Sequence, residues 1–142
     1  MDKSLQLDIV TPDREVFSDS VQYVGARGVD GEFGVLPGHV QLLAALATGN
    51  LQYTMLDGTR KYAFVNGGFA EVMNDRVTIL AESSELAENI DAARAIESKK
   101  RAEKRLESRN EEINLERANA SLQRAIARLY VHEILKRTPH QP

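Results

Sequence analysis

Residues 51–65 read LQYTMLDGTRKYAFV, and this stretch decides the fold of the first half of the chain. Leu51, Tyr53 and Met55 alternate with other residues, which is the period of a strand with one buried face. Asp57-Gly58 follows, a dipeptide that favours the tight turn of a β-hairpin. The aromatic and β-branched residues after this turn predict a returning strand, so we expect an antiparallel hairpin.

The same alternation recurs on both sides of this hairpin. Residues 5–9 alternate near the start of the chain, and we expect further strands over residues 69–73 and 77–81, the second being the last strand. Many short strands joined by close turns are typical of an antiparallel β-sandwich or flattened barrel. We therefore predict such a domain over residues 1–86.

After Glu85 the glycines and aromatic residues become rare, and the hydrophobic period changes to that of helices. A first helix is expected to carry an apolar stripe of Ala92, Ala95, Ala102 and Leu106. A second is expected to carry a seam with heptad spacing, made of Leu115, Ala118, Leu122, Ala125 and Leu129. The sequence thus predicts an antiparallel two-helix hairpin over residues 87–137.

The ends of these helices also have sequence signals. Ser108-Arg109-Asn110 interrupts the apolar pattern and is expected to cap the second helix, with Glu111 and Glu112 in its first turn. The tail, residues 138–142, is predicted to be flexible. Because alanine dominates both stripes, burying them contributes little free energy, and we expect a hairpin that can open.

Composition excludes several classes of protein. The chain has 42% hydrophobic and 27% charged residues, which is typical of a globular protein and too apolar for a disordered one. No run reaches the ~18 apolar residues that span a bilayer, so no membrane insertion is expected. The absence of cysteine excludes disulfides and thiolate chemistry and fits a reducing, cytosolic location.

No pattern of catalytic or metal-binding residues stands out. Glycines recur every third residue from Gly25 to Gly34, but no phosphate-binding loop motif is present, and turns or bulges explain them. His39, His132 and His140 are too widely spaced for a metal site. The sequence therefore predicts no catalytic residues, no metal and no independent enzyme.

Charge is unevenly distributed along the chain. Residues 1–86 carry 6 basic and 12 acidic side chains, whereas residues 87–142 carry 12 basic and 9 acidic ones. A basic hairpin raises the alternative of a nucleic-acid-binding module. However, its basic residues alternate with glutamates at helical salt-bridge spacing, and Tyr130 is its one aromatic residue. A solvated charged hairpin that binds no nucleic acid is the favoured interpretation.

Four motifs give the chain a resemblance to a known family. They are TPD at 11–13, GEFGVLPGH at 31–39, VNGGF at 65–69 and IDAARA at 90–95. With them the chain resembles the epsilon subunit of bacterial F-type rotary ATP synthases over nearly its whole length. The resemblance implies a non-catalytic subunit of a proton-translocating ATP synthase, peripheral on the cytoplasmic face of the bacterial inner membrane.

The resemblance also implies partners for the β domain. It would bind the gamma subunit and the polar loops of the c-ring in the central stalk. Glu32 and His39, in the GEFGVLPGH loop, are the candidates for the ring-facing contact. The alternative is that the glycines and Pro37 only shape a turn. Glu32 is the stronger candidate because an exposed acid between two glycines has no obvious packing role.

For the hairpin, the resemblance implies a regulatory element. It would be compact against the β domain, or extended into the catalytic head, where it obstructs ATP hydrolysis. Arg117, Arg124 and Arg128 on the second helix are the candidates for contacts with acidic loops of the catalytic alpha and beta subunits.

The resemblance further implies a regulatory ATP site on the compact hairpin, with no obligatory cofactor. Its matching residues are Glu85, Ile90, Asp91, Arg94, Arg101, Arg124 and Arg128. Helical spacing supports a convergence of the four arginines, because residues four or seven apart share a face. The alternatives are an ordinary Asp91–Arg128 salt bridge, and a purely mechanical rotor subunit that binds no nucleotide.

Overall fold

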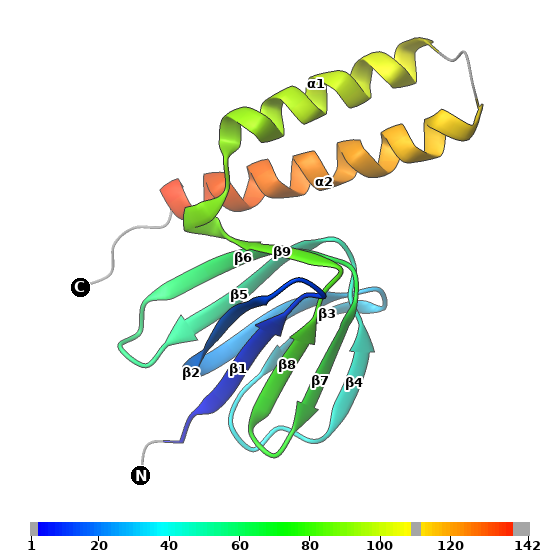
Figure 1. Ribbon diagram of the computed structural model, residues 1–142. Coiled ribbons are helices and arrows are strands. Elements are labelled where there is room, and N and C mark those ends of the chain that lie inside the picture. Colours follow the sequence, from blue (N-terminus) through cyan, green and yellow to red (C-terminus); the bar gives the residue numbers. More distant parts are fainter. Residues whose placement is uncertain (1–2, 109–111, 138–142) are drawn as a thin grey trace.

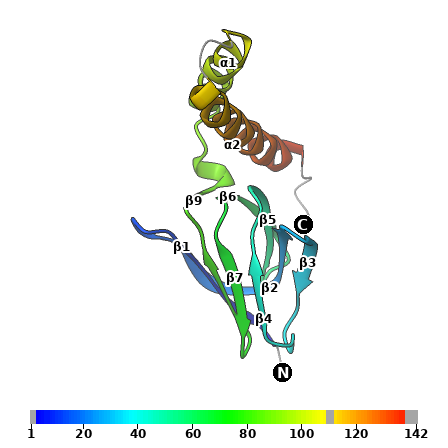
Figure 2. The same cartoon turned by 90° about the vertical axis from the view of Figure 1, so that its right-hand side faces the viewer.

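The computed structural model describes residues 3–108 and 112–137 (Figure 1). Within them the N-terminal part forms a nine-stranded sheet. The strands are β1 (Leu5–Val10), β2 (Glu15–Gly28), β3 (Gly31–Val35), β4 (Leu42–Ala45), β5 (Gly49–Met55), β6 (Arg60–Asn66), β7 (Phe69–Met73), β8 (Arg76–Leu80) and β9 (Ser83–Leu86). They are ordered β4-β7-β8-β1-β2-β5-β6-β9, with β3 paired to β2. The sheet curls into a sandwich, as Figure 2 shows, and a bridge between Gly28 and Leu46 helps to close it.

The period-two residues form the core of the sandwich. Leu5, Leu7 and Ile9 of β1 are completely buried, and Val77 and Ile79 of the neighbouring β8 are buried with them. Their polar neighbours along each strand face outward, since successive side chains point to opposite sides of a sheet. The prediction of a β domain built on this alternation is confirmed.

The β-hairpin predicted from residues 51–65 is present as β5 and β6. Leu51 pairs with Ala63 across the two strands. In the turn, the carboxylate of Asp57 accepts a hydrogen bond of 2.9 Å from the Thr59 amide. Gly58 has a φ of +91°, in the region that favours glycine, which explains the choice of Asp-Gly at this position.

Two features of the sheet differ from the prediction. First, β1 and β8 pair in parallel, although the sheet was expected to be antiparallel throughout. No tight turn joins these two strands, so no hairpin geometry fixes their direction. Second, β9 follows β8 as the last strand and pairs with β6. Its sequence, SSEL, hides the strand because a serine occupies its buried position.

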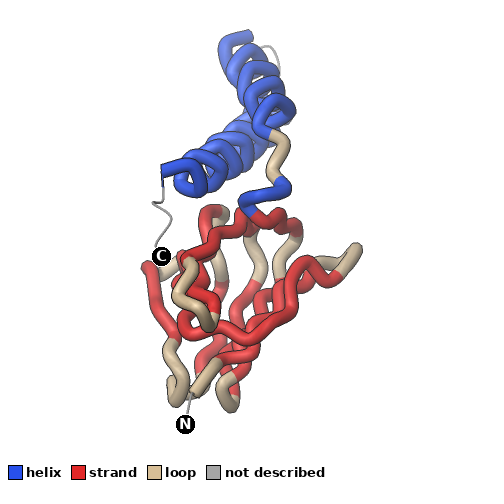
Figure 3. Tube along the Cα trace, turned by 90° about the vertical axis from the view of Figure 1, so that its left-hand side faces the viewer, coloured by secondary structure: helices blue, strands red, loops and turns tan. Residues whose placement is uncertain are grey.

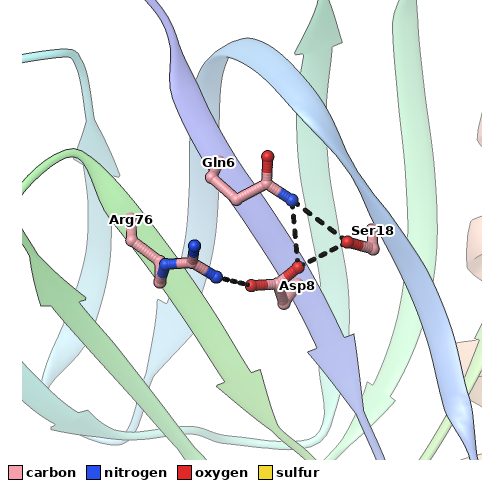
Figure 4. Close-up of polar contacts among 4 residues, drawn as sticks. All are labelled: Gln6, Asp8, Ser18 and Arg76. Atoms are coloured by element: carbon pink, nitrogen blue, oxygen red, sulfur yellow. Dashed lines mark hydrogen bonds and ion pairs between the residues drawn. The ribbon is translucent and has the colours of Figure 1, made fainter.

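A polar network on the outer face joins β1 to both of its neighbours (Figure 4). The carboxylate of Asp8 accepts hydrogen bonds from the Ser18 hydroxyl of β2 at 2.6 Å and from the Gln6 amide at 3.1 Å. Its second oxygen pairs with Arg76 of β8 at 2.7 Å. The hydrogen bond from Ser18 comes first among the causes that hold the pKa of Asp8 below its ordinary value of 3.8, and Gln6 and Arg76 act in the same direction, against the opposing effect of burial.

The C-terminal part forms two helices, α1 (Ala92–Ser108) and α2 (Glu112–Arg137). They lie side by side and run in opposite directions (Figure 1), and both lie above the sandwich (Figure 3). Ala95, Ala102, Ala118 and Ala125 are buried at the seam, whereas its leucines are only partly buried. Small residues let the two helices approach closely but bury little apolar area. The predicted two-helix hairpin with an alanine-rich seam is confirmed.

The ends of the helices are described in part. At the start of α1, the Asp91 carboxylate accepts a hydrogen bond of 3.1 Å from the Arg94 amide, which caps the helix. The predicted break and cap at residues 109–110, Glu111 and the tail at residues 138–142 lie outside the described residues. α2 begins at Glu112. Between β9 and α1 the chain makes a short 3₁₀ helix, η1 (Ala87–Asn89).

The Asp8 network gives a prediction about pH. Because the pKa of Asp8 is lower in the folded chain, its stabilising effect is fully present above pH 3.8 and is lost as the pH falls through the lowered pKa. We expect Asp8→Asn to reduce the free energy of unfolding by about 1–2 kcal/mol at pH 7, and by less below about pH 3. Urea unfolding at several pH values measures this. Asp13→Asn, at an exposed position, is the control; an equal loss for both variants would contradict the role of the network.

Candidate functional site

The second helix rests on the outer face of the sandwich, over β5 and β6. A hydrophobic cluster, separate from the sandwich core, fills this junction: it comprises Tyr62, Phe64, Ala87, Ile90 and Val131. Ala127 and Ile134 of α2 pack against it. This cluster is small, so the hairpin is attached to the sandwich by far less buried apolar surface than holds the sandwich itself together.

Next to this cluster, Arg128 of α2 contacts the sandwich through charge. Its Nε atom lies 2.5 Å from Oε1 of Glu85 in β9. Its guanidinium carbon lies 4.5 Å from the centre of the Phe64 ring in β6. Glu85 and Phe64 are directly paired across the two strands, so the sheet presents the acid and the ring together. We call this trio, Arg128 with Glu85 and Phe64, the latch.

Both interactions of the latch are partly shielded from water. The side chains of Arg128 and Glu85 are 27% and 30% exposed. An ion pair in such a position is screened less than one on the open surface. The arginine over the aromatic face adds a cation–π contact of roughly 0.5–2 kcal/mol. The latch therefore contributes to docking of α2 at the cost of fixing only a few side chains.

The structure places the predicted nucleotide residues in separate surroundings. Glu85 and Arg128 meet in the latch, and Ile90 is buried in the adjacent cluster. Asp91 caps α1, and the Arg128 ion pair is made with Glu85 and not with Asp91. The alternative prediction of an Asp91–Arg128 salt bridge is therefore wrong, because Arg128 pairs with Glu85.

The other predicted arginines lie further along the hairpin. Arg101 contacts the Ser98 hydroxyl at 3.2 Å and Glu97 at 4.0 Å, and its side chain is 62% exposed. Arg94 is exposed as well. Arg124 donates a hydrogen bond of 3.1 Å to Ser121 and lines a cavity with Arg105 and Arg117. Arg117 is exposed, whereas Arg124 and Arg128 are partly buried.

Sequence reasoning missed Phe64, the aromatic half of the latch. A signal was available in β6, because Tyr62 to Val65 is an uninterrupted apolar run, and all four residues are buried. A strand that is apolar on both faces is covered on both faces. The run therefore indicated that something packs on the outside of the sandwich at β6, and α2 is what packs there.

The GEFGVLPGH block was predicted to be one loop, but it is a strand followed by a turn. Its first five residues form β3, which pairs with β2 with Glu32 opposite Arg27. A turn follows, in which the His39 amide donates to the Leu36 carbonyl at 3.1 Å and Gly38 has a φ of +88°. Glu32 is exposed near one end of β3, and His39 lies beyond the other end. A strand separates them because exposed Glu32 and Gly34 alternate with the inward-facing Phe33 and Val35, which fits the pleat.

Two possible functions, metal binding and membrane crossing, need particular arrangements of residues. Among residues 3–108 and 112–137, no three His, Asp or Glu side chains are grouped so that they could hold a metal ion. In the same part of the chain, no helix is both long and apolar enough to cross a membrane. The arrangement that the structure does offer is a charged, weakly attached hairpin beside a rigid sandwich.

Comparisons with known proteins agree with this two-part architecture. Residues 4–87 match the family model for the β-sandwich domain of the ATP synthase delta/epsilon chain, and residues 88–133 match the model for its long α-helix domain. The chain therefore belongs to the ATP synthase delta/epsilon chain family, as an epsilon-type, non-catalytic subunit.

Curated relatives support the same assignment, and a solved structure shares the fold. The ATP synthase epsilon chain of Nitratidesulfovibrio vulgaris strain DP4 is 55% identical over 131 residues, 92% of this chain and 97% of that one. The epsilon chain of Bacillus velezensis is 44% identical over 129 residues, 91% of this chain and 97% of that one. A chain of the Euglena gracilis mitochondrial ATP synthase has the same fold, with a TM-score of 0.68 at 24% identity, over 96% of this chain and 82% of that one.

The latch gives a prediction about the attachment of α2. Glu85→Gln removes the ion pair but keeps the size of the side chain, so α2 should detach more often. We expect the hairpin, which is rich in lysine and arginine, to be cut by trypsin about three- to tenfold faster under native conditions, equivalent to about 1 kcal/mol. Glu88→Gln, at an exposed position in η1, is the matched control. Equal cleavage rates in the two variants would show that the ion pair does not hold the hairpin.

Proposed function

We propose that this chain works in the central stalk of a proton-translocating ATP synthase, where it couples the rotor to the catalytic head and restrains ATP hydrolysis through its hairpin. The gamma subunit, the c-ring loops and the catalytic alpha and beta subunits are its proposed partners. Membership of the family supports this role. The similar Euglena chain comes from an assembly of OSCP, F1 and c-ring, and a Tetrahymena thermophila chain of similar fold (TM-score 0.50) from a central stalk and c-ring. The proposed location is peripheral, on the cytoplasmic face of the bacterial inner membrane.

In this proposal the sandwich is the part that stays on the rotor. Its outer face over β4, β7 and β8 exposes large apolar side chains: Leu43 is 70% exposed, Phe69 52% and Leu80 50%. Apolar side chains gathered on one face are typical of protein interfaces. We assign this face to the gamma subunit. Glu32 and His39 remain the proposed ring-facing residues, as two contacts separated by β3 and not as one.

The hairpin is the part that moves in this proposal. The observation that carries this point is the latch, which joins α2 to the sandwich through a partly exposed arginine beside a small hydrophobic cluster. Attachment of this kind is weak enough to be shifted by a partner or ligand. When α2 detaches, Arg128 is released from the sandwich and joins Arg117 and Arg124 as a contact for acidic loops of the catalytic subunits, where the extended hairpin would obstruct hydrolysis.

ATP is the proposed ligand that biases this equilibrium toward the docked hairpin. Arg94 and Arg101 of α1 and Arg124 and Arg128 of α2 come from the two helices that must stay together for a shared ligand to bind. Guanidinium groups donate paired hydrogen bonds to phosphate, so they suit this task without a phosphate-binding loop. A ligand that binds only the docked form stabilises it by about 2.7 kcal/mol at 100 times its dissociation constant. Plentiful ATP would then permit turnover, and scarce ATP would release the hairpin to inhibit.

A purely mechanical rotor subunit is the second candidate. The observation that favours it is that Glu85 already satisfies the charge of Arg128, and Phe64 covers its guanidinium group. In that case the arginines serve contacts within the complex, and the latch is only structural. ATP binding by the isolated chain separates the two candidates.

Calorimetric titration of the full chain with ATP, ADP and GTP, with and without magnesium, makes the test. We expect saturable, ATP-selective binding, weakened about tenfold or more in Arg101→Gln, because a phosphate contact of this kind is lost. Lys100→Gln, which removes the same charge from the next exposed position, should bind ATP like the unmodified chain.

The absence of heat up to millimolar ATP would leave the mechanical rotor as the function. If Arg101→Gln and Lys100→Gln weaken ATP binding equally, the binding is a non-specific electrostatic attraction. Either outcome would contradict the proposed nucleotide response without affecting membership of the family.

A further inference from the structure

The distal half of the hairpin contains a basic cavity that the proposed nucleotide site does not explain. It has a volume of about 600 Å³ and is lined by Arg105, Arg117, Ala120, Ser121 and Arg124. Arg105 comes from α1 and the other residues from α2, so both helices build it. Arg105 and Arg117 lie outside the residues predicted to bind ATP.

The charges around this cavity are unbalanced. Among residues 3–108 and 115–136, whose side chains the structure describes, no carboxylate lines it. In the same part of the chain, no ion pair is recorded for Arg105, Arg117 or Arg124. Three guanidinium groups around one hollow repel one another, and a bound anion would remove that repulsion.

The cavity wall also carries several hydrogen-bond donors. The Arg124 guanidinium donates to the Ser121 hydroxyl at 3.1 Å, which fixes both groups on the wall of the cavity. Ala120 adds no bulk there, so the space between the arginines stays open to solvent. Planar guanidinium forks match the oxygens of a tetrahedral phosphate, with two hydrogen bonds from each.

We propose that this cavity binds a free phosphate-class oxyanion, inorganic phosphate or pyrophosphate, at a site that shares Arg124 with the proposed ATP site but is otherwise built from Arg105, Arg117 and Ser121. Such an anion joins Arg105 of α1 to Arg117 and Arg124 of α2, and therefore holds the two helices together near the far end of the hairpin. The inference goes beyond the proposed ATP response, because its ligand is free phosphate and because Arg105 and Arg117 are not among the residues proposed to bind ATP.

Titration of the full chain with inorganic phosphate and with pyrophosphate, followed by calorimetry and by amide chemical shifts, tests the proposal. We expect saturable binding that Arg105→Gln and Arg117→Gln each weaken about tenfold or more. Lys104→Gln is the matched control, since Lys104 is an exposed neighbour on α1 that does not line the cavity. Shift changes should centre on Ser121 and Arg124.

Arg101→Gln separates this proposal from the proposed ATP response. It should weaken ATP binding and leave phosphate binding intact, whereas Arg105→Gln should do the reverse. The proposal is overturned if neither phosphate nor pyrophosphate binds, or if Lys104→Gln weakens binding as much as Arg105→Gln. It is also overturned if Arg105→Gln weakens ATP alone, because the cavity would then belong to the nucleotide site. Circular dichroism confirms that each variant keeps its helices.

Discussion

The guanidinium group of Arg128 contacts an acid and an aromatic ring that the sheet presents side by side, and this contact joins the hairpin to the sandwich beside a small hydrophobic cluster. Glu85 and Phe64 are cross-strand partners in β9 and β6, so their spacing is fixed by the sheet. The sheet is rigid because its core is completely buried along β1 and β8. Arg128 therefore meets a surface that is already in place, and only α2 has to move for the contact to form or break.

The two parts of the chain differ in how they are stabilised. The sandwich buries leucine, isoleucine and valine side chains, each of which contributes about 1.5–3 kcal/mol on full burial. The hairpin buries four alanines at its seam and rests on one small cluster. The hairpin is therefore held by less buried apolar surface than the sandwich, both between its own helices and against the sandwich. The opening of the hairpin that we propose would be favoured by alanine at these positions.

Much of this could be predicted from the sequence. The alternation at Leu5, Leu7 and Ile9 and the Asp57-Gly58 turn gave strands and a hairpin, because a period of two has one structural meaning. The shift to alanine and leucine at helical spacing predicted the C-terminal two-helix hairpin. The parallel pairing of β1 with β8 could not be predicted, since it depends on long-range closure of the sheet and not on a local pattern. The strand β9 could not be predicted because its buried position holds a polar residue, Ser84. This serine tolerates burial because its hydroxyl donates a hydrogen bond of 2.7 Å to the Phe64 carbonyl.

The candidate site was predicted less completely. Family motifs pointed to Glu85 and Arg128 but paired neither with the other, because their contact joins residues 43 positions apart. Helical spacing placed arginines on common faces, yet it could not show that Arg128 turns to the sandwich while Arg124 turns to a cavity with Arg105 and Arg117. Side-chain direction at a junction depends on what lies opposite, and only the folded structure supplies that.

The most direct test of this account is native-state amide hydrogen exchange of the isolated chain, comparing α2 with β1 and β8. Local opening exposes weakly attached elements before global unfolding does. The account predicts that amides of α2 exchange at least about tenfold faster than those of β1 and β8 and show little dependence on the stability of the sandwich. Exchange of α2 at the same free energy as the sandwich, through one global unfolding, would contradict the claim that the hairpin is attached separately and weakly.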